Sequence, residues 1–318
     1  MTSKKDLLLV DLFKLFIRDS VSGKRLKKDG KKIKAQTIEN YNAVLLLLQE
    51  FEKHNLCKVR IRLVNSKNKK FLIVEKNYWK KFYLSFTDFM YKQKGCYDNY
   101  VGIVIKMIRI FFRYLQIEKM IPVGEFYKQF HIYREEIPIV TLLPEQLKFL
   151  INNSQFDEKL SPALIRTKNI FVLGCTVALR YSDLFSMKFT DIEYFNGNSY
   201  LCVKSKKTET VTRIKLPEYV IEIIQRFRFK HGTRKTILPS FSKNQLNKNL
   251  KFLAEKAGWT HTLIKKRSRR GKEINILKVE GKSNYRFCDL ISSHTMRRTA
   301  IFVSSVSAGT CGSIHSPL

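Results

Sequence analysis

The apolar run from Phe171 to Leu184 constrains the fold of this chain more than any other stretch. It reads Phe-Val-Leu-Gly-Cys-Thr-Val-Ala-Leu-Arg-Tyr-Ser-Asp-Leu, which predicts a buried helix that ends abruptly at Arg180 and a short polar turn. A guanidinium at such a helix end presents a planar set of donors that suits an oxyanion such as phosphate. The alternative is an arginine whose stem lies on the rim of a core while its charge stays in water. The run alone leaves both interpretations of Arg180 open.

A second basic feature, the pair His294 and Arg297, lies far downstream in Ser293-His294-Thr295-Met296-Arg297-Arg298. If this segment is helical, His294 and Arg297 are three residues apart and share one face of the helix. Taken alone, such a pair is more often a solvated helix face. Two arginines and a histidine directed at one phosphate, however, would form a phosphoryl-transfer site.

The two segments resemble the two arginine boxes of the tyrosine recombinases of the phage-integrase family. Ala178 to Leu184 is similar to the first box, and Ser293 to Ala300 is similar to the His-x-x-Arg box. Between them, Val203 to Pro217 resembles the hairpin that carries the catalytic lysine of the family, which maps onto Lys207. Order and spacing agree, and the chain is most similar to integrases of mobile elements in Bacteroides-type bacteria. Without the resemblance, Lys207 is an ordinary turn lysine in a basic segment.

The resemblance implies a metal-free and cofactor-free phosphoryl transfer through a phosphotyrosine intermediate. Arg180 and Arg297 would bind the non-bridging oxygens of the scissile phosphate, where charge develops. His294 would add a hydrogen bond or manage the proton of the nucleophile, and Lys207 would protonate the leaving 5′ oxygen as a general acid. The implied function is site-specific DNA recombination or integration, with strand cleavage and joining.

The chain departs from the family pattern after Ala300. The tail is rich in Ser and Gly, which predicts that the helix breaks there, and no tyrosine follows Tyr285. A frameshifted or truncated gene would produce such a tail, so the C-terminal part of the catalytic domain is expected to be incomplete; a naturally short tail is the alternative. Two hypotheses follow: a recombinase whose nucleophile comes from another subunit, and a catalytically inactive DNA-binding remnant.

The charge of the chain indicates its partner. Sixty Lys and Arg against 27 Asp and Glu give a formal net charge of +33 at pH 7. Such an excess opposes compaction unless a polyanion neutralises it, so we expect double-stranded DNA as the partner, with self-association on DNA. A basic RNA-associated protein would explain the charge but not the three ordered boxes.

No segment is apolar and long enough to span a bilayer, and no secretory signal is present, so a cytoplasmic protein without a membrane partner is expected. The six cysteines are scattered without Cys-x-x-Cys pairs, which argues against a zinc site or a disulfide framework.

We expect a mainly α protein of the α+β class with two domains. Residues 1–137 are predicted to form a helical core-binding, DNA-clamping domain, with Thr37 and Asp98 as helix caps and a short strand at Val59 to Val64. Lys106, Arg109 and Arg113 share one stripe of a helix, which is either a solvated face or a surface that lies on DNA.

Residues 138–318 are predicted to form the catalytic domain. Its expected elements are helices at Pro144 to Asn152 and at Pro162 to Gly174 and a small sheet of three antiparallel strands, at Ile192 to Phe195, Tyr200 to Lys204 and Val211 to Leu216. Ser182 and Asp183 are candidate caps of the helix after Arg180, and Asp183 is a candidate for holding Arg180 in place. His261 to Leu290 is expected to be a basic hairpin or flexible insertion, solvated rather than reading bases.

Overall fold

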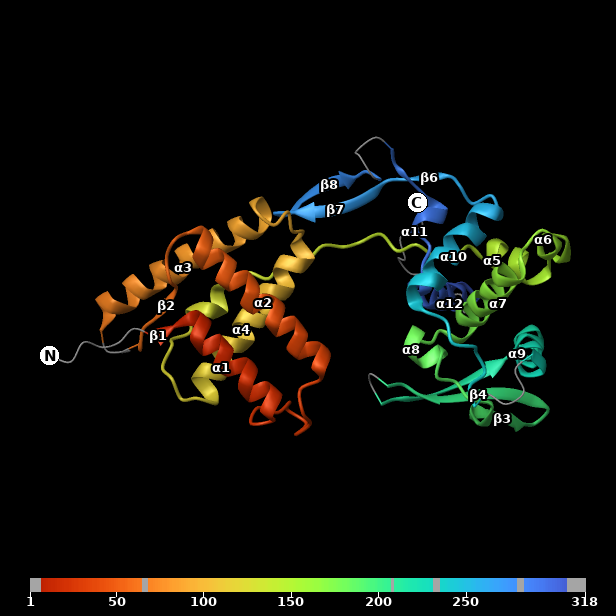
Figure 1. Ribbon diagram of the computed structural model, residues 1–318, viewed down its shortest axis with the longest axis horizontal. Helices are drawn as coiled ribbons and strands as arrows, with labels where there is room; N and C mark the ends of the chain where they lie inside the picture. The colour runs from red at the N-terminus through yellow and green to blue at the C-terminus, as the bar shows by residue number, and fades with distance from the viewer. Residues whose placement is uncertain (1–6, 65–67, 207–208, 231–234, 279–282, 308–318) are drawn as a thin grey trace. The chain divides into compact units, whose positions relative to one another are not determined.

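The computed structural model describes residues 7–64, 68–206, 209–230, 235–278 and 283–307 and divides the chain into two compact units (Figure 1). Unit 1 comprises Met1–Glu136 and Lys266–Ile274, and unit 2 comprises Ile137–Lys265 and Asn275–Leu318. The chain therefore leaves unit 1 after Glu136, returns to it at Lys266, and leaves it again after Ile274. A segment inside the second predicted domain thus belongs to the first unit.

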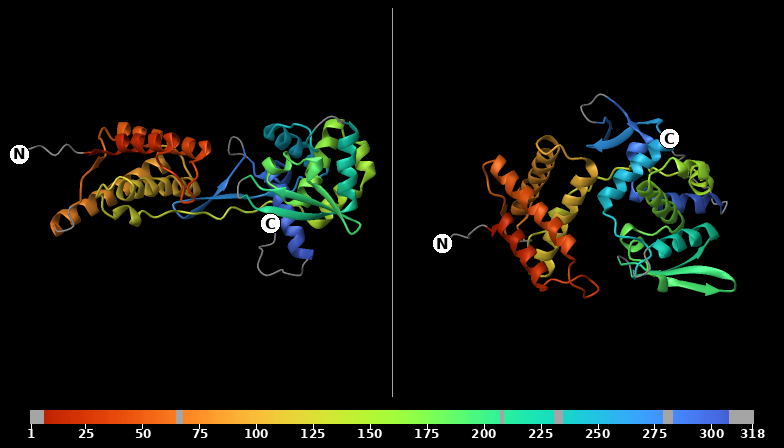
Figure 2. Two further views of the ribbon diagram at one scale, coloured as in Figure 1. Left: turned by 90° about the horizontal axis from the view of Figure 1, so that it is seen from below. Right: turned by 45° about the vertical axis from the view of Figure 1, so that its right-hand side comes forward.

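Unit 1 is a helical bundle with two very short strands and a late hairpin. Its elements are β1 (Leu7–Leu8), α1 (Leu9–Ser22), α2 (Ala35–His54), β2 (Arg60–Ile61), α3 (Lys69–Lys92), α4 (Asp98–Ile117), the 3-10 turn η1 (Phe126–Gln129), and the hairpin strands β7 (Lys265–Arg269) and β8 (Lys272–Ile276). Helices α1 and α2 pack side by side, and both contact α4 (Figure 2). Strand β1 pairs with β2 in antiparallel register, Leu7 opposite Ile61.

The core of unit 1 is unusually aromatic. Phe13, Phe16, Phe86, Phe111 and Phe112 are all fully or almost fully buried. Their rings meet mostly at tilted or edge-to-face angles, for example Phe13 and Phe111 with centroids 4.9 Å apart, which is the arrangement that the ring quadrupole favours. Because α4 buries its apolar residues at helical spacing, its basic residues are left on the opposite stripe.

Unit 2 is a helical body with a three-stranded antiparallel sheet, as the sequence predicted. Its elements are α5 (Pro144–Asn152), α6 (Ser154–Glu158), α7 (Pro162–Val177), α8 (Tyr181–Leu184), the 3-10 turn η2 (Phe189–Asp191), β3 (Ile192–Phe195), β4 (Asn198–Lys204), β5 (Val211–Leu216), α9 (Glu218–Lys230), α10 (Lys243–Lys256), β6 (Thr262–Leu263), β9 (Tyr285–Arg286), α11 (Phe287–Leu290) and α12 (Ser293–Ser307). The sheet order is β3-β4-β5, and β3 and β4 meet at Asn196 and Gly197, which both have positive φ. Helix α7 is buried along most of its length and packs against α5, α9, α10 and α12.

Several local predictions are wrong in instructive ways. Helix α2 begins before Thr37, and the residue that caps it is Lys34. Asp98 lies inside α4, where its carboxylate accepts bonds from the hairpin and from Tyr91 in place of the first-turn amides. Helix α12 continues past Ala300 to Ser307, and there the hydroxyls of Ser304 and Ser305 donate to carbonyls of their own helix.

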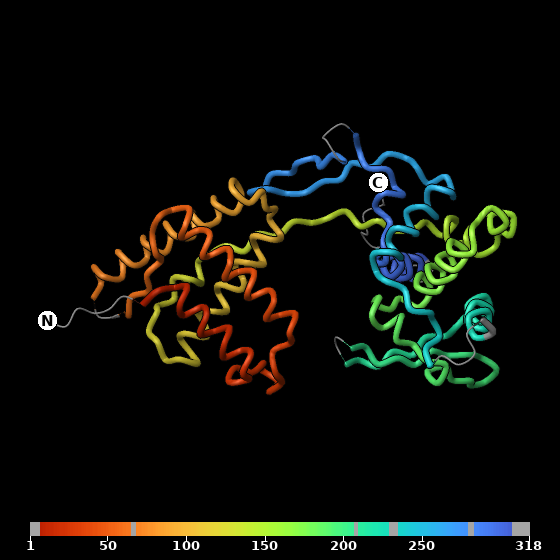
Figure 3. Tube along the Cα trace, viewed as in Figure 1, coloured from red at the N-terminus to blue at the C-terminus, as the bar shows by residue number. Residues whose placement is uncertain are grey.

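The basic segment after His261 does form a hairpin, β7–β8, but its first strand is half-buried rather than solvated. The hairpin runs to the N-terminal end of α4, within unit 1 (Figure 3). Across the part of the chain that the structure describes, no helix is both long and apolar enough to cross a bilayer.

Candidate functional site

Arg180 is placed by an abrupt end of helix α7. The helix stops at Val177, and Ala178 adopts the left-handed conformation with φ of 54° and ψ of 17°. A non-glycine residue there costs roughly 1 kcal/mol, so the surrounding packing holds this turn. Leu179 then inserts into the core, and Arg180 follows in extended conformation as the residue that precedes α8. The turn thus carries a half-buried guanidinium out of the most buried helix of unit 2.

Asp183 and Ser205 tie Arg180 to the turn between β4 and β5. Arg180 Nη1 donates to Ser205 Oγ over 3.1 Å, and Ser205 Oγ donates to Asp183 Oδ2 over 3.2 Å. The other oxygen of Asp183 accepts from the N–H of Lys206 at 3.2 Å, and the side chain of Asp183 is almost entirely buried. Asp183 therefore acts on Arg180 through Ser205 rather than by direct contact, and it does not cap α8 with its side chain. The other guanidinium donors of Arg180 are left for a ligand.

His294 and Arg297 lie one turn apart on α12, and α12 packs against α7. The close approach of these helices depends on Gly174, where an added Cβ would lie 2.5 Å from the sulfur of Met296. The N–H of Leu142 also donates to Thr299 Oγ1 at 2.9 Å, and the N–H of Ser293 donates to Asn247 Oδ1 at 2.8 Å. Both sequence boxes are therefore attached to helix α7, one just beyond its end and the other on a helix packed along it.

The charge around His294 is positive. Partial burial and the neighbouring cations Lys243 and Arg298 lower the pKa of His294 below its usual value of 6.5. Arg297 is half-buried and has no hydrogen bond or ion pair with any residue that the structure describes. A neutral imidazole beside arginines without acidic partners is an environment that favours an anion.

Lys207, the predicted general acid, lies outside the described residues. Its neighbour Lys206 is described, and the N–H of Lys206 is the one bonded to Asp183. On either side of the undescribed residues, the N–H of Ser205 donates to the carbonyl of Thr210 at 2.9 Å.

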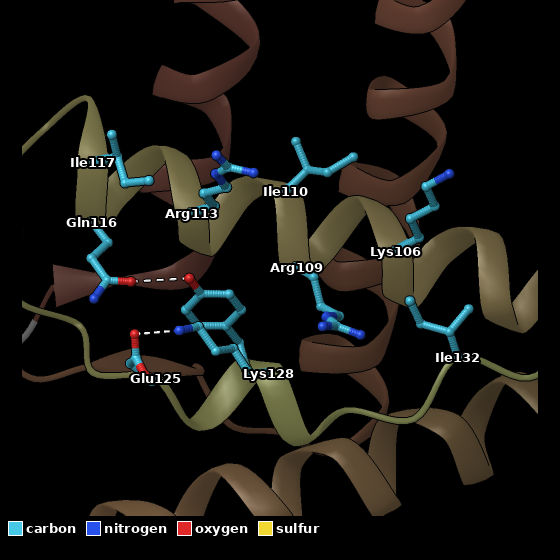
Figure 4. Close-up of a pocket in the computed structure, with 10 residues that line it drawn as sticks. Lys106, Arg109, Ile110, Arg113, Gln116, Ile117, Glu125, Lys128 and Ile132 are labelled. Atoms are coloured by element: carbon cyan, nitrogen blue, oxygen red, sulfur yellow. Dashed lines mark hydrogen bonds and ion pairs between the residues drawn. The ribbon is translucent and has the colours of Figure 1, made fainter.

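In unit 1, Lys106, Arg109 and Arg113 line one groove together with residues of the segment around η1. Figure 4 shows the three side chains on α4: Arg109 extends toward the segment that carries Glu125, Lys128 and Ile132, whereas Lys106 and Arg113 extend from the other side of the helix in this view. None of the three has a hydrogen bond or ion pair to a described residue, whereas Lys128 is paired with Glu125. Gln116 accepts a hydrogen bond from Tyr127 Oη at 3.0 Å and so fixes one end of the groove. The groove thus carries three unpaired cations.

Sequence reasoning missed Ser205 and Lys128. A serine two residues before a lysine in a turn gives no signal of its own, because its contact with Arg180 spans 25 positions of sequence. Lys128 comes from a 3-10 turn whose approach to α4 no periodicity predicts. Among the described residues, no group of three or more His, Cys, Asp and Glu is arranged to hold a metal ion.

No protein-family model matches the sequence, and no curated protein matches it. Solved structures do resemble it. A lambda integrase dimer bound to a COC′ core site superposes with a TM-score of 0.60 at 13% identity, covering 96% of this chain and 72% of that one. The XerH site-specific recombinase bound to a palindromic difH substrate gives 0.60 at 11% identity, covering 95% and 85%. The Tn1549 transposon integrase in complex with circular intermediate DNA gives 0.55 at 15% identity, covering 95% and 88%. The chain therefore has the fold of the tyrosine recombinases.

Proposed function

We propose that this protein is a site-specific DNA recombinase or integrase of a mobile element, which acts on double-stranded DNA in the cytoplasm and self-associates on it. The observation that carries the proposal is the groove of unit 1, where Lys106, Arg109 and Arg113 stand without acidic partners. Lys and Arg gathered on one helix face are the electrostatic footprint of a surface that contacts phosphates, and no acidic partner competes for these three cations. The fold shared with DNA-bound recombinases supports the same function.

In unit 2, we assign Arg180 and Arg297 to the oxygens of the scissile phosphate. Arg180 is oriented by Ser205, and Arg297 has no described partner that a phosphate would have to displace. His294 would stabilise the same phosphate, and Lys207 would protonate the leaving 5′ oxygen, a role that rests on the family resemblance alone.

A second candidate function, DNA binding without strand cleavage, is favoured by the tyrosines of unit 2. Tyr181 donates its hydroxyl proton to the carbonyl of Phe241, and Tyr219 shares a hydrogen bond of 2.9 Å with Thr176. Burial raises the pKa of both tyrosines, which disfavours the phenolate. None of the five tyrosines of unit 2 lies on α12, the helix of the His-x-x-Arg box.

The groove is tested by the salt dependence of duplex binding. Each cation that neutralises a phosphate contributes about −0.9 to the slope of log affinity against log salt. Replacing Arg109 and Arg113 with Gln should therefore make the slope shallower by about 1.8 and weaken binding at low salt. The matched control is Lys14→Gln on α1, a cation already paired with Asp11 at 3.4 Å. Equal slopes for the groove variant and the wild type would remove the groove from the DNA interface.

A further inference from the structure

The tip of hairpin β7–β8 is held by carboxylates of unit 1. Arg267 and Ser268 bind Glu135, Arg270 and Gly271 bind Asp98, and each contact spans more than a hundred positions of sequence. All of these residues belong to unit 1. The hairpin is therefore attached along its side and at its turn, by two different carboxylates.

Glu135 is built as an acceptor for an arginine. Its side chain has no exposed area, and one oxygen accepts from Arg267 Nε at 3.0 Å and from Nη2 at 2.7 Å. The other oxygen accepts from the N–H of Ser268 at 2.5 Å. Burial alone would raise the pKa of Glu135, but the bonds from Arg267 and Ser268 outweigh burial and lower it. Asn99 fixes the backbone of Glu135 through bonds of 3.1 Å and 3.2 Å.

Asp98 is built as an acceptor for the turn of the hairpin. Its carboxylate is 1% exposed and accepts from the N–H of Arg270 at 2.7 Å and from the N–H of Gly271 at 2.8 Å. Arg270 and Gly271 have φ of 56° and 74°, the turn geometry that projects two adjacent N–H groups outward. Tyr91 Oη donates a third bond to Asp98 at 2.6 Å. A buried carboxylate with three donors is satisfied only while the turn is present.

The ring of Tyr97 contacts the arginines of the hairpin beside the two carboxylates. The guanidinium of Arg267 lies 4.4 Å from the ring centre of Tyr97, and that of Arg269 lies 5.1 Å from the same ring. Arg269 also donates to the carbonyl of Gly95 at 3.0 Å. The ion pair of Arg270 with Asp88 is different, because both side chains are well exposed and salt screens such a pair.

We propose that Glu135, Asp98, Tyr91 and Tyr97 form a docking site for an arginine-rich β-hairpin, and that β7–β8 of the same chain is its occupant. The partner chemistry is specific: a turn with two outward N–H groups, preceded by an arginine three residues before its first turn residue. Docking engages Nε and Nη2 of Arg267 with Glu135 and places its guanidinium over the ring of Tyr97, so these two donors are taken within unit 1 and are not offered to nucleic acid. Glu135 and Asp98 carry the docking, whereas the Asp88 pair adds little.

Hydrogen exchange on the full chain without DNA tests the docking, so its outcome is independent of the proposed function. The readout is the exchange rate of peptides that contain the amides of Ser268, Arg270 and Gly271. In Glu135→Gln or Asp98→Asn, an amide N–H₂ group faces donors of the hairpin, and exchange should accelerate about tenfold or more. Asp88→Asn, the matched control at the exposed pair, should change the rate less than about threefold.

Three results would overturn the proposal. The first is fast exchange of the hairpin amides in the wild type, and the second is an equal effect of all three substitutions. The third is protection that increases with protein concentration, which would assign the occupant to a second copy of the chain. To separate undocking from loss of fold, exchange of the α1 and α2 peptides in unit 1 is followed in the same samples, and Arg267→Gln removes the main contact from the hairpin side. This variant should also accelerate exchange of the hairpin amides about tenfold.

Discussion

At the scale of single residues, His294 should make both the stability of the fold and the binding of phosphate at the proposed site depend on pH. Its pKa is lowered in the folded chain, so near this pKa the folded state binds fewer protons than the unfolded state. The stability that His294 contributes is therefore complete above its usual value of 6.5 and is lost as the pH falls through the lowered pKa. A phosphate bound at this site would raise the pKa of His294, because its negative charge favours the imidazolium form.

We accordingly expect duplex DNA to raise the pKa of His294. The measurement is an NMR titration of the imidazole Cε1–H of His294, free and with saturating duplex, and the signal is assigned with His294→Gln. Binding should take up protons and strengthen as the pH falls from about 7.5 to about 6. An unchanged pKa in a chain shown to be bound would place His294 away from the phosphate.

At the scale of elements, Gly174 sets the distance between α7 and α12. A methyl group at this position would lie 2.5 Å from Met296 Sδ and 3.1 Å from Met296 Cβ. Because the Cβ is part of the helix and cannot move aside freely, we expect Gly174→Ala to lower the free energy of unfolding by about 1–3 kcal/mol. Urea denaturation measures the change, and Met296→Ala in the same chain should restore part of the loss if the contact causes it. Additive losses would contradict this account.

Sequence patterns predicted the bounds of one helix and the pairing of two strands correctly. Helix α5 begins and ends at Pro144 and Asn152 as predicted, and the strand pairing around Asn196-Gly197 is confirmed, since local turn chemistry decides both. Cap predictions failed at Thr37 and Asp98. A polar side chain near a helix start signals a cap only while no distant donor competes for it, and Asp98 is taken by amides 172 and 173 positions away. The same limit hides Ser205, whose role depends on a contact across the fold.

The candidate site also has parts that the sequence predicted and parts that it did not. Sequence boxes predicted that Arg180, His294 and Arg297 stand near helix ends and on one helix face, and the structure attaches both boxes to α7. The stripe of Lys106, Arg109 and Arg113 was visible from its spacing, whereas the opposite wall of the groove was not. Which charges are already paired can only be read from three-dimensional contacts.

At the scale of the whole molecule, the two candidate functions differ in covalent chemistry. Attack on a phosphate requires a hydroxyl held in line with it, and arginines cannot replace that hydroxyl. Since the hydroxyls of Tyr181 and Tyr219 are engaged in hydrogen bonds, we expect no denaturant-resistant adduct on either residue when the chain is incubated with a nicked duplex that traps the intermediate. Mass spectrometry of the denatured mixture is the measurement. An adduct on Tyr181 or Tyr219 would favour cleavage by this chain and contradict the assignment of their hydroxyls.

The hairpin in its docking site has a consequence for the order of events during synthesis. Glu135 leaves the ribosome 132 positions before Arg267, its partner. At about 5–20 residues per second, the helices of unit 1 have on the order of ten seconds to assemble before the hairpin exists. During that interval Glu135 and Asp98 have no hairpin partners, so unit 1 passes through a stage that is looser at the start of α4 than the finished protein. Its last step of folding is then set by translation of the hairpin segment, whose Arg267 follows Glu135 by 132 positions.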